Sequence, residues 1–221
     1  MVIDQEHSPF DRLTIDSALL AARASGMAGL VRVANAEAST ILSALDCGAT
    51  GVLVPHVATA AKARDVAAAA RYRGGRRGYS GSVRAANYGA TPMWKYIDES
   101  DAQTTVIAQI EDPEALDEID AIAAVEGIDG LFIGRGDLTA AFAAPSNDAP
   151  QIRAAVERIA KAAGDVGKPI AVFIASNAEA SWLRDFGAST FVVSSDQGFL
   201  RRAAASALSE LRTVTAPGSK A

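Results

Sequence analysis

Short apolar runs alternate along this chain with longer segments whose apolar residues recur at helical spacing. The short runs are rich in β-branched residues and too brief for buried helices, so we expect each to form a strand buried on both faces. Seven strands are predicted, beginning near Val2, Gly29, Gly51, Thr105, Gly130, Ile170 and Thr190. The predicted helices span Leu13–Ser25, Ala36–Leu45, Ala58–Arg71, Met93–Asp98, Pro113–Val125, Gln151–Val166, Ala178–Phe186 and Phe199–Val214.

This βαβα alternation predicts an α/β protein with a parallel sheet covered by helices, in one domain that spans residues 1–214. A (β/α)8 TIM barrel is the favoured architecture, with seven of its eight strands readable in the chain. A doubly wound sheet stays open as the alternative. That fold usually carries a glycine fingerprint after its first strand, and none is present here. Residues 215–221 are expected to form a polar, frayed tail.

Charge and cysteine content narrow the function classes. With 21 Lys and Arg against 26 Asp and Glu, the formal net charge is −5, which argues against a general affinity for nucleic acid or for anionic membranes. The single cysteine, Cys47, excludes an internal disulfide and a cysteine zinc cluster, and its apolar setting predicts a buried thiol. No apolar run reaches the ~18 residues of a membrane span, so we expect a cytoplasmic protein.

Two carboxylates follow neighbouring predicted strands. Glu111 comes directly after the strand at 106–110, and Asp137 comes shortly after the strand at 130–133. Because neighbouring parallel strands lie ~4.8 Å apart, acids at equivalent strand ends can converge on one hard cation. The alternative is helix capping, a role that the sequence Glu111-Asp112-Pro113 also fits.

Further polar residues lie at or just past other strand ends. His7, flanked by acids, is either a general base or part of a surface turn. Arg32 has apolar neighbours and is expected to meet an anion, which is either a substrate or a nearby acid. His56 is a possible ligand, although the pattern favours a packed, hydrogen-bonded residue. In a barrel all these residues, with Gln109, face one mouth.

A glycine-rich segment, Tyr72–Ala90, interrupts the alternation. It and the residue before it carry five arginines, Arg71, Arg73, Arg76, Arg77 and Arg84. The spacing is not that of a nucleotide-binding loop. The segment is therefore either a mobile surface loop or a lid over an anionic small substrate, and its length favours the second.

Six motifs, in order along nearly the whole chain, resemble those of a known family. They read IDQEHSP, VRV, LDCGATGVLVP, RRGYSGSVRAANYG, IAQIED and GLFIGRGDL. The chain is similar to the HpcH/HpaI class II pyruvate-dependent aldolases, typified by 4-hydroxy-2-oxo-heptanedioate aldolase. The resemblance implies a (β/α)8 barrel and a divalent metal. It also implies reversible cleavage of 4-hydroxy-2-oxo acids to pyruvate, or a related 2-oxo acid, and an aldehyde.

The resemblance also implies roles for individual residues. Glu111 and Asp137 match the metal ligands, while Gln109 and the backbone of Gly136 and Asp137 match the groups that hold the 2-oxo acid. His7 matches the base. Two further matches are Arg32, for the residue that stabilises the enolate oxygen, and Asp46, for an acid that raises the basicity of the histidine.

The implied cofactor is Mg²⁺, Mn²⁺ or Co²⁺, and the implied partners are the oxo acid, the aldehyde and further copies of the chain. A homohexamer with exchanged C-terminal helices is expected from the resemblance, with no nucleic acid or membrane partner. Two alternatives remain: a citrate or malyl-CoA lyase, and a non-catalytic barrel subunit. The family pattern has a further strand and helix before the first motif, so we expect a sheet with two open edges.

Overall fold

Seven parallel strands form a single sheet, and their order in the sheet, β1 to β7, is their order in the chain. The computed structural model describes residues 1–215. The strands are Val2–Asp4 (β1), Leu30–Arg32 (β2), Gly51–Val54 (β3), Thr105–Ile110 (β4), Gly130–Ile133 (β5), Ile170–Ile174 (β6) and Ala188–Val193 (β7). All seven predicted strands are therefore confirmed. The sequential order rules out a doubly wound sheet, in which the strand order reverses.

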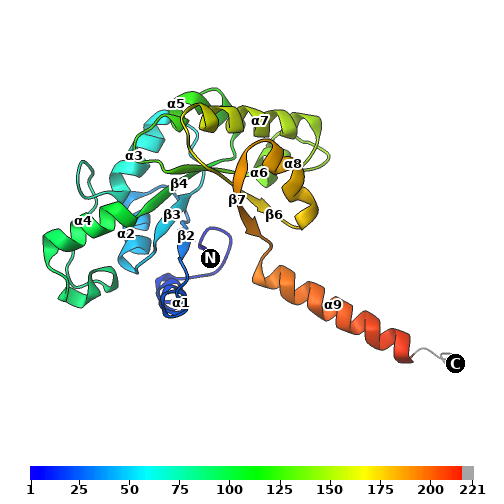
Figure 1. Ribbon diagram of the computed structural model, residues 1–221, viewed down its shortest axis with the longest axis horizontal. Helices are drawn as coiled ribbons and strands as arrows, with labels where there is room; N and C mark the ends of the chain where they lie inside the picture. The colour runs from blue at the N-terminus through cyan, green and yellow to red at the C-terminus, as the bar shows by residue number, and fades with distance from the viewer. Residues whose placement is uncertain (216–221) are drawn as a thin grey trace.

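Helices connect consecutive strands and cover the outer side of the curved sheet (Figure 1). The α-helices are Arg12–Ala24 (α1), Ala38–Asp46 (α2), Ala60–Ala70 (α3), Met93–Gln103 (α4), Ile119–Ala123 (α5), Arg135–Ala141 (α6), Pro150–Asp165 (α7), Ala180–Asp185 (α8) and Asp196–Thr215 (α9). Short 3-10 turns span Arg84–Gly89 (η1), Pro113–Leu116 (η2) and Asn177–Glu179 (η3).

The strands bury side chains on both faces. Outward residues such as Val52, Val106 and Leu131 pack against the helices in the main core. Inward residues form a second layer, in which Leu53, Phe132 and Ala171 are buried and Val2, Ile107 and Val192 pack against them. This two-sided burial explains why the strands read as uninterrupted apolar runs.

The described sheet is curved and unclosed. Consecutive strands pair from β1 to β7, and no pairing joins β1 to β7 in residues 1–215. The part of the TIM-barrel prediction that the structure supports is thus a seven-stranded partial barrel. No helix in the described range combines the length and the hydropathy that a bilayer span requires.

Three helix predictions need correction. The segment predicted as one helix from Pro113 to Val125 is broken into η2 and α5, and the segment from Ala178 to Phe186 is divided between η3 and α8. Helix α6, which was not predicted, starts two residues after β5. The predicted tail at 215–221 lies outside the described residues except for Thr215, which ends α9.

Candidate active site

The polar residues singled out by the sequence gather largely at the carboxyl ends of the strands. Asp4 and Arg32 are the last residues of β1 and β2 and lie in register as direct neighbours. His56 lies two residues beyond β3, and Glu111 directly follows β4. Asp137 lies in the first turn of α6, beyond β5. One edge of the sheet therefore presents all five.

Arg32 is held by two acids of the first strand and its loop. Its Nε donates to Asp4 Oδ1 at 2.9 Å, its Nη2 donates to Asp4 Oδ2 at 2.5 Å, and its Nη1 lies 3.2 Å from Glu6 Oε2. Burial alone would raise the pKa of Asp4. The Arg32 pair and the backbone N–H groups of His7 and Glu6 outweigh it and lower that pKa. The guanidinium is thus fixed in place, charged, beside the mouth.

Glu111 is the buried acid of the site, with 2% of its surface exposed. Its Oε1 accepts a hydrogen bond from the backbone N–H of His56 at 2.8 Å, and its Oε2 accepts one from the Gln109 side-chain amide. Burial, together with the charge of Asp137, raises the pKa of Glu111 despite these donors. A positive charge nearby would stabilise the ionised form of a carboxylate in this position.

Gly134 makes room for that carboxylate. A Cβ at position 134 would lie 2.5 Å from Glu111 Cβ and 2.8 Å from Glu111 Oε2, so no larger residue fits without moving the acid. No sequence pattern marks this glycine, because the clash depends on the packing of two neighbouring strand ends.

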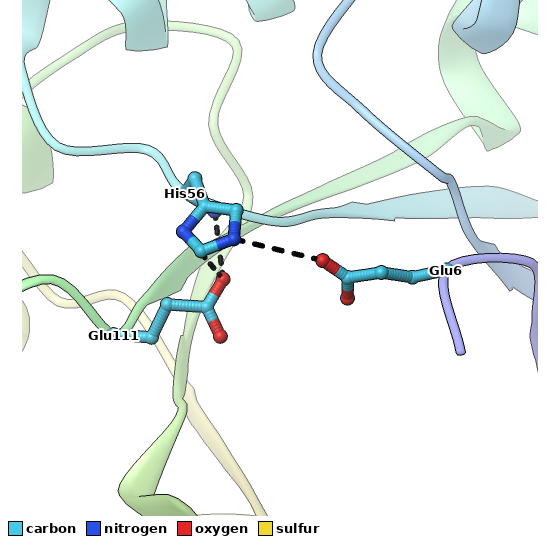
Figure 2. Close-up of side chains that lie close together, drawn as sticks. All are labelled: Glu6, His56 and Glu111. Atoms are coloured by element: carbon cyan, nitrogen blue, oxygen red, sulfur yellow. Dashed lines mark hydrogen bonds and ion pairs between the residues drawn. The ribbon is translucent and has the colours of Figure 1, made fainter. Parts of the chain in front are cut away.

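His56 lies between two carboxylates (Figure 2). Its Nε2 is 3.7 Å from Glu6 Oε1, and its Nδ1 is 3.5 Å from Glu111 Oε1 and 3.0 Å from Asp112 Oδ1. Burial would lower the pKa of His56, but Asp112, Glu111 and Glu6 together raise it. The ligand atoms of Glu6, His56 and Glu111 all lie within 4.8 Å of one another. We refer to Glu6, Arg32, His56 and Glu111 as the mouth cluster.

The predicted base and substrate groups lie around this cluster. The His7 side chain is 64% exposed, and its Nε2 is 3.8 Å from Glu6 Oε2. Gln109 is buried, and its Oε1 has no hydrogen-bond partner in the described structure. Gly136 and Asp137 are exposed, and a Cβ at Gly136 would meet nothing within 4 Å, so there is open space in front of it.

Asp46 is the predicted site residue that the structure does not bring to the mouth. It ends α2, just before β3 begins, which places it at the amino ends of the strands. Its carboxylate lies 3.4 Å from Arg77 Nη2. Burial raises the pKa of Asp46, although Arg77 and Arg12 act in the opposite direction. That Asp46 raises the basicity of His7 remains a prediction.

The glycine-rich segment also lies away from the mouth, between the end of α3 and the start of α4. The four arginines of the segment and Arg71 before it are all paired with acids: Arg71 with Asp129, Arg73 with Asp98, Arg76 with Asp65, Arg77 with Asp46 and Arg84 with Asp16. The predicted lid over an anionic substrate is therefore not supported, because these guanidinium groups already have partners.

Oxygen ligands dominate the mouth, and this donor set fits a divalent cation. Buried Glu6 Oε2 has no aligned hydrogen-bond donor among the described residues, although Arg32 Nη1 is near it. Gln109 Oε1 is a second buried acceptor without a donor. Buried acceptors without donors are costly unless a cation or water satisfies them.

Known proteins resemble this chain over most of its length. The profile of the family described as HpcH/HpaI aldolase/citrate lyase matches residues 1–203. A 5-keto-4-deoxy-D-glucarate aldolase of Enterobacter sp. strain 638 is 37% identical over 205 residues, which cover 92% of this chain and 79% of the relative. The aldolase of that name from Escherichia fergusonii is 38% identical over 203 residues, which cover 91% and 78% of the two chains.

A solved structure supports the same relationship. An HpcH/HpaI aldolase/citrate lyase family protein from Burkholderia cenocepacia J2315 superposes with a TM-score of 0.89 at 33% identity, covering 96% of this chain and 84% of the other. The HpcH/HpaI aldolase from Desulfitobacterium hafniense DCB-2 gives the same TM-score at 26% identity, covering 100% and 85%.

Proposed function

This chain belongs to the HpcH/HpaI aldolase/citrate lyase family, and from that premise we propose that it is a divalent-metal-dependent aldolase acting on 4-hydroxy-2-oxo acids. The carbon–carbon lyase class follows from the family and its named relatives. The metal, the substrate class and the residue roles are the proposal. The observation that carries it is the buried Glu111 carboxylate, which faces Glu6 and the charge of Asp137 at one edge of the sheet.

Glu111 and Asp137 are proposed to hold Mg²⁺, Mn²⁺ or Co²⁺, which prefer or accept carboxylate oxygens and leave positions open for a bidentate substrate. When bound, such a cation supplies Lewis acidity toward the ketone oxygen of the substrate. Burial makes the negative charge of Glu111 unfavourable and raises its pKa. A bound cation would offset this cost by neutralising the charge.

Arg32 stabilises the negative charge that develops on the former ketone oxygen. Its pairing with Asp4 fixes the guanidinium at the end of β2, so it needs no reorganisation during the reaction. An oxyanion-stabilising group of this kind contributes on the order of 3 kcal/mol.

His7 takes the proton from the 4-hydroxyl group. The C3–C4 bond then breaks, an aldehyde leaves with C4, and the electron pair of the broken bond forms the enolate of the 2-oxo acid. Protonation of C3 gives pyruvate or a related 2-oxo acid. His7 suits this role because its imidazole is 64% exposed and lies beside the mouth cluster, 3.8 Å from Glu6 Oε2.

Gln109 and the first turn of α6 are proposed to hold the 2-oxo acid. Gln109 retains a free Oε1, and the space before Gly136 admits a small carboxylate next to the backbone. The relatives' named substrate fits the same class. Numbered from its keto end, a 5-keto-4-deoxyglucarate is a 4-hydroxy-2-oxo acid with a carboxylate at each end.

The complete assembly is proposed to be a closed (β/α)8 barrel in a homo-oligomer, a hexamer by family resemblance. Helix α9 supports the second part, because it projects from the sheet (Figure 1) and exposes Phe199, Leu200, Leu208 and Val214. Exposed apolar side chains along one long helix are typical of a surface that another chain covers.

The test is release of pyruvate from 4-hydroxy-2-oxo acids, measured with a coupled lactate dehydrogenase assay. We expect activity that EDTA abolishes and Mn²⁺ restores. Activity that survives complete metal removal would contradict the metal-dependent mechanism. Cleavage of citryl-CoA or malyl-CoA in place of oxo acids would favour the citrate-lyase branch of the family.

A further inference from the structure

His56 has no role in the mechanism above, yet it occupies the centre of the mouth cluster. Its ring nitrogens face Glu6 on one side and Glu111 and Asp112 on the other. The sequence favoured a packed, hydrogen-bonded residue: the hydrogen bond is present, to Asp112, but the side chain is 53% exposed and is not packed.

The backbone of His56 is held in an unusual conformation. Its φ is +54°, in the left-handed region that non-glycine residues rarely adopt. This conformation directs the backbone N–H to Glu111 Oε1 at 2.8 Å. Strained backbone that persists beside a polar site points to a functional demand on the residue.

Asp112 orients the imidazole. Its Oδ1 lies 3.0 Å from His56 Nδ1, and a hydrogen bond from Nδ1–H to this carboxylate leaves the Nε2 lone pair free. Nε2 then faces Glu6 Oε1 across 3.7 Å, a distance that two metal–ligand bonds of ~2.1 Å can span. A carboxylate that holds the far nitrogen is the usual companion of a metal-binding histidine.

We infer that His56 is a nitrogen ligand of the cation held by Glu111, with Glu6 as a further oxygen ligand, and that this nitrogen biases the site toward Mn²⁺ or Co²⁺ over Mg²⁺. The inference rests on the proposed function for the presence of the cation. First-row transition-metal ions such as Mn²⁺ and Co²⁺ accept an imidazole nitrogen more readily than the harder Mg²⁺, which prefers an all-oxygen environment. Glu6 Oε2 is an independent indication: it is buried and has no aligned hydrogen-bond donor, and Arg32, which is already paired with Asp4, is the one permanent cation near it among the described residues.

The experiment compares metal-stripped wild-type protein with His56→Asn, loaded with Mn²⁺ or with Mg²⁺. Asparagine tolerates positive φ, so the backbone N–H should still reach Glu111. His7→Asn is the matched control, because it removes the other histidine of the chain. Isothermal titration calorimetry gives both affinities, and pulsed EPR of bound Mn²⁺ detects directly coordinated ¹⁴N.

The wild-type protein and His7→Asn should show histidine ¹⁴N coupling that His56→Asn lacks. The preference for Mn²⁺ over Mg²⁺ should fall about tenfold in His56→Asn and stay unchanged in His7→Asn. Absence of ¹⁴N coupling in the wild type, or its persistence in His56→Asn, would overturn the inference. An unchanged metal preference would do the same, and would leave His56 as an ion-pair partner of Asp112.

Failure of the proposed function gives a different result. If Glu111→Gln binds Mn²⁺ as tightly as the wild type, the proposed metal site itself is wrong. If ¹⁴N coupling is present but no oxo acid is cleaved, the ligand assignment stands and the aldolase reaction is wrong.

Discussion

Two charged clusters lie at opposite ends of the strands, and they differ in how their charges are balanced. The mouth cluster has two carboxylates, Glu6 and Glu111, and one permanent cation, Arg32, which is also paired with a third carboxylate beside the cluster, Asp4. The rear cluster, defined as Asp46, Tyr72, Arg77, Tyr96 and Ser100, has a single guanidinium and a single carboxylate.

The unpaired atoms in the two clusters are also of opposite kinds. In the mouth cluster and its neighbour Gln109, Glu6 Oε2 and Gln109 Oε1 are acceptors without an aligned hydrogen-bond donor, whereas in the rear cluster the atom without a partner is a donor, Arg77 Nε. Arg77 compensates by lying over the Tyr72 ring, 4.5 Å from its centroid. A cluster with surplus acceptors needs a cation from outside, while a balanced pair stabilises the fold by itself.

The largest effect should come from removing the buried acid of the mouth. Glu111→Gln should lower kcat/KM for pyruvate release by about 10³-fold or more, because it removes a metal ligand and the charge that it supplies. Steady-state kinetics with added Mn²⁺ measure it. The exposed acid Glu114 provides the control, and Glu114→Gln should keep full activity. Near-normal rates in Glu111→Gln would show that the mouth cluster is not the site of the reaction.

The rear cluster should affect stability and not metal binding. Arg77→Met removes a buried guanidinium, leaves the partly buried Asp46 without this partner, and should lower the free energy of unfolding by about 3 kcal/mol. Urea denaturation measures the change, and calorimetry should find Mn²⁺ affinity unaltered. Arg76→Met, which breaks an exposed pair with Asp65, should change stability little. A large loss of Mn²⁺ affinity in Arg77→Met would contradict the claim that the rear cluster has no part in metal binding.

A methyl group at Gly134 should disturb the mouth without changing any charge. Gly134→Ala forces Glu111 to move, and metal affinity should fall about 10- to 100-fold, as it does when the support of a ligand is lost. Titration calorimetry measures the affinity. Gly164→Ala in α7, where a Cβ meets nothing within 4 Å, should bind metal normally. Equal affinities in the two variants would show that Glu111 is not held by this contact.

The smallest effect concerns the anchor of the turn that carries Asp137. Arg135 donates to Glu179 at 2.5 Å and to the Phe173 carbonyl at 2.8 Å, which ties α6 to the end of β6. Burial would raise the pKa of Glu179. Arg135 and two backbone N–H groups lower it below its ordinary 4.5. The pair therefore stabilises the protein fully above pH 4.5, and this contribution is lost as the pH falls through the lowered pKa.

Glu179→Gln should cost about 1 kcal/mol near pH 7, after allowance for solvent screening. Urea unfolding of both proteins between pH 3 and 7 measures the difference, which should shrink below pH 4.5. Glu126→Gln, on an exposed acid, provides the control. A difference that stays constant across this range would show that the ionised pair is not its source.

The sequence was sufficient to predict all seven strands, since each is buried on both faces and needs no partner information to be recognised. Helix α6 was missed because it has seven residues and begins with Arg-Gly-Asp, which resembles a loop. The buried thiol of Cys47 was also confirmed.

Site residues that directly end or follow a strand could be predicted from the sequence. Arg32 was expected to meet either an anionic substrate or a nearby acid, and it meets Asp4 and Glu6. The central position of His56 was not predictable, because it depends on a left-handed backbone turn that no glycine or asparagine marks. The pairing of the four arginines in the glycine-rich segment, and of Arg71 before it, was missed for a similar reason, since their acid partners are mostly distant in sequence.

The most direct test of the account is exchange of the pyruvate methyl protons for deuterium, followed by NMR in D₂O with and without Mn²⁺. It examines the base, Arg32 and the metal without requiring the correct aldehyde. We predict Mn²⁺-dependent exchange that Glu111→Gln abolishes. Exchange at the same rate after complete chelation of the metal, or no exchange in Mn²⁺-loaded wild-type protein, would contradict the account.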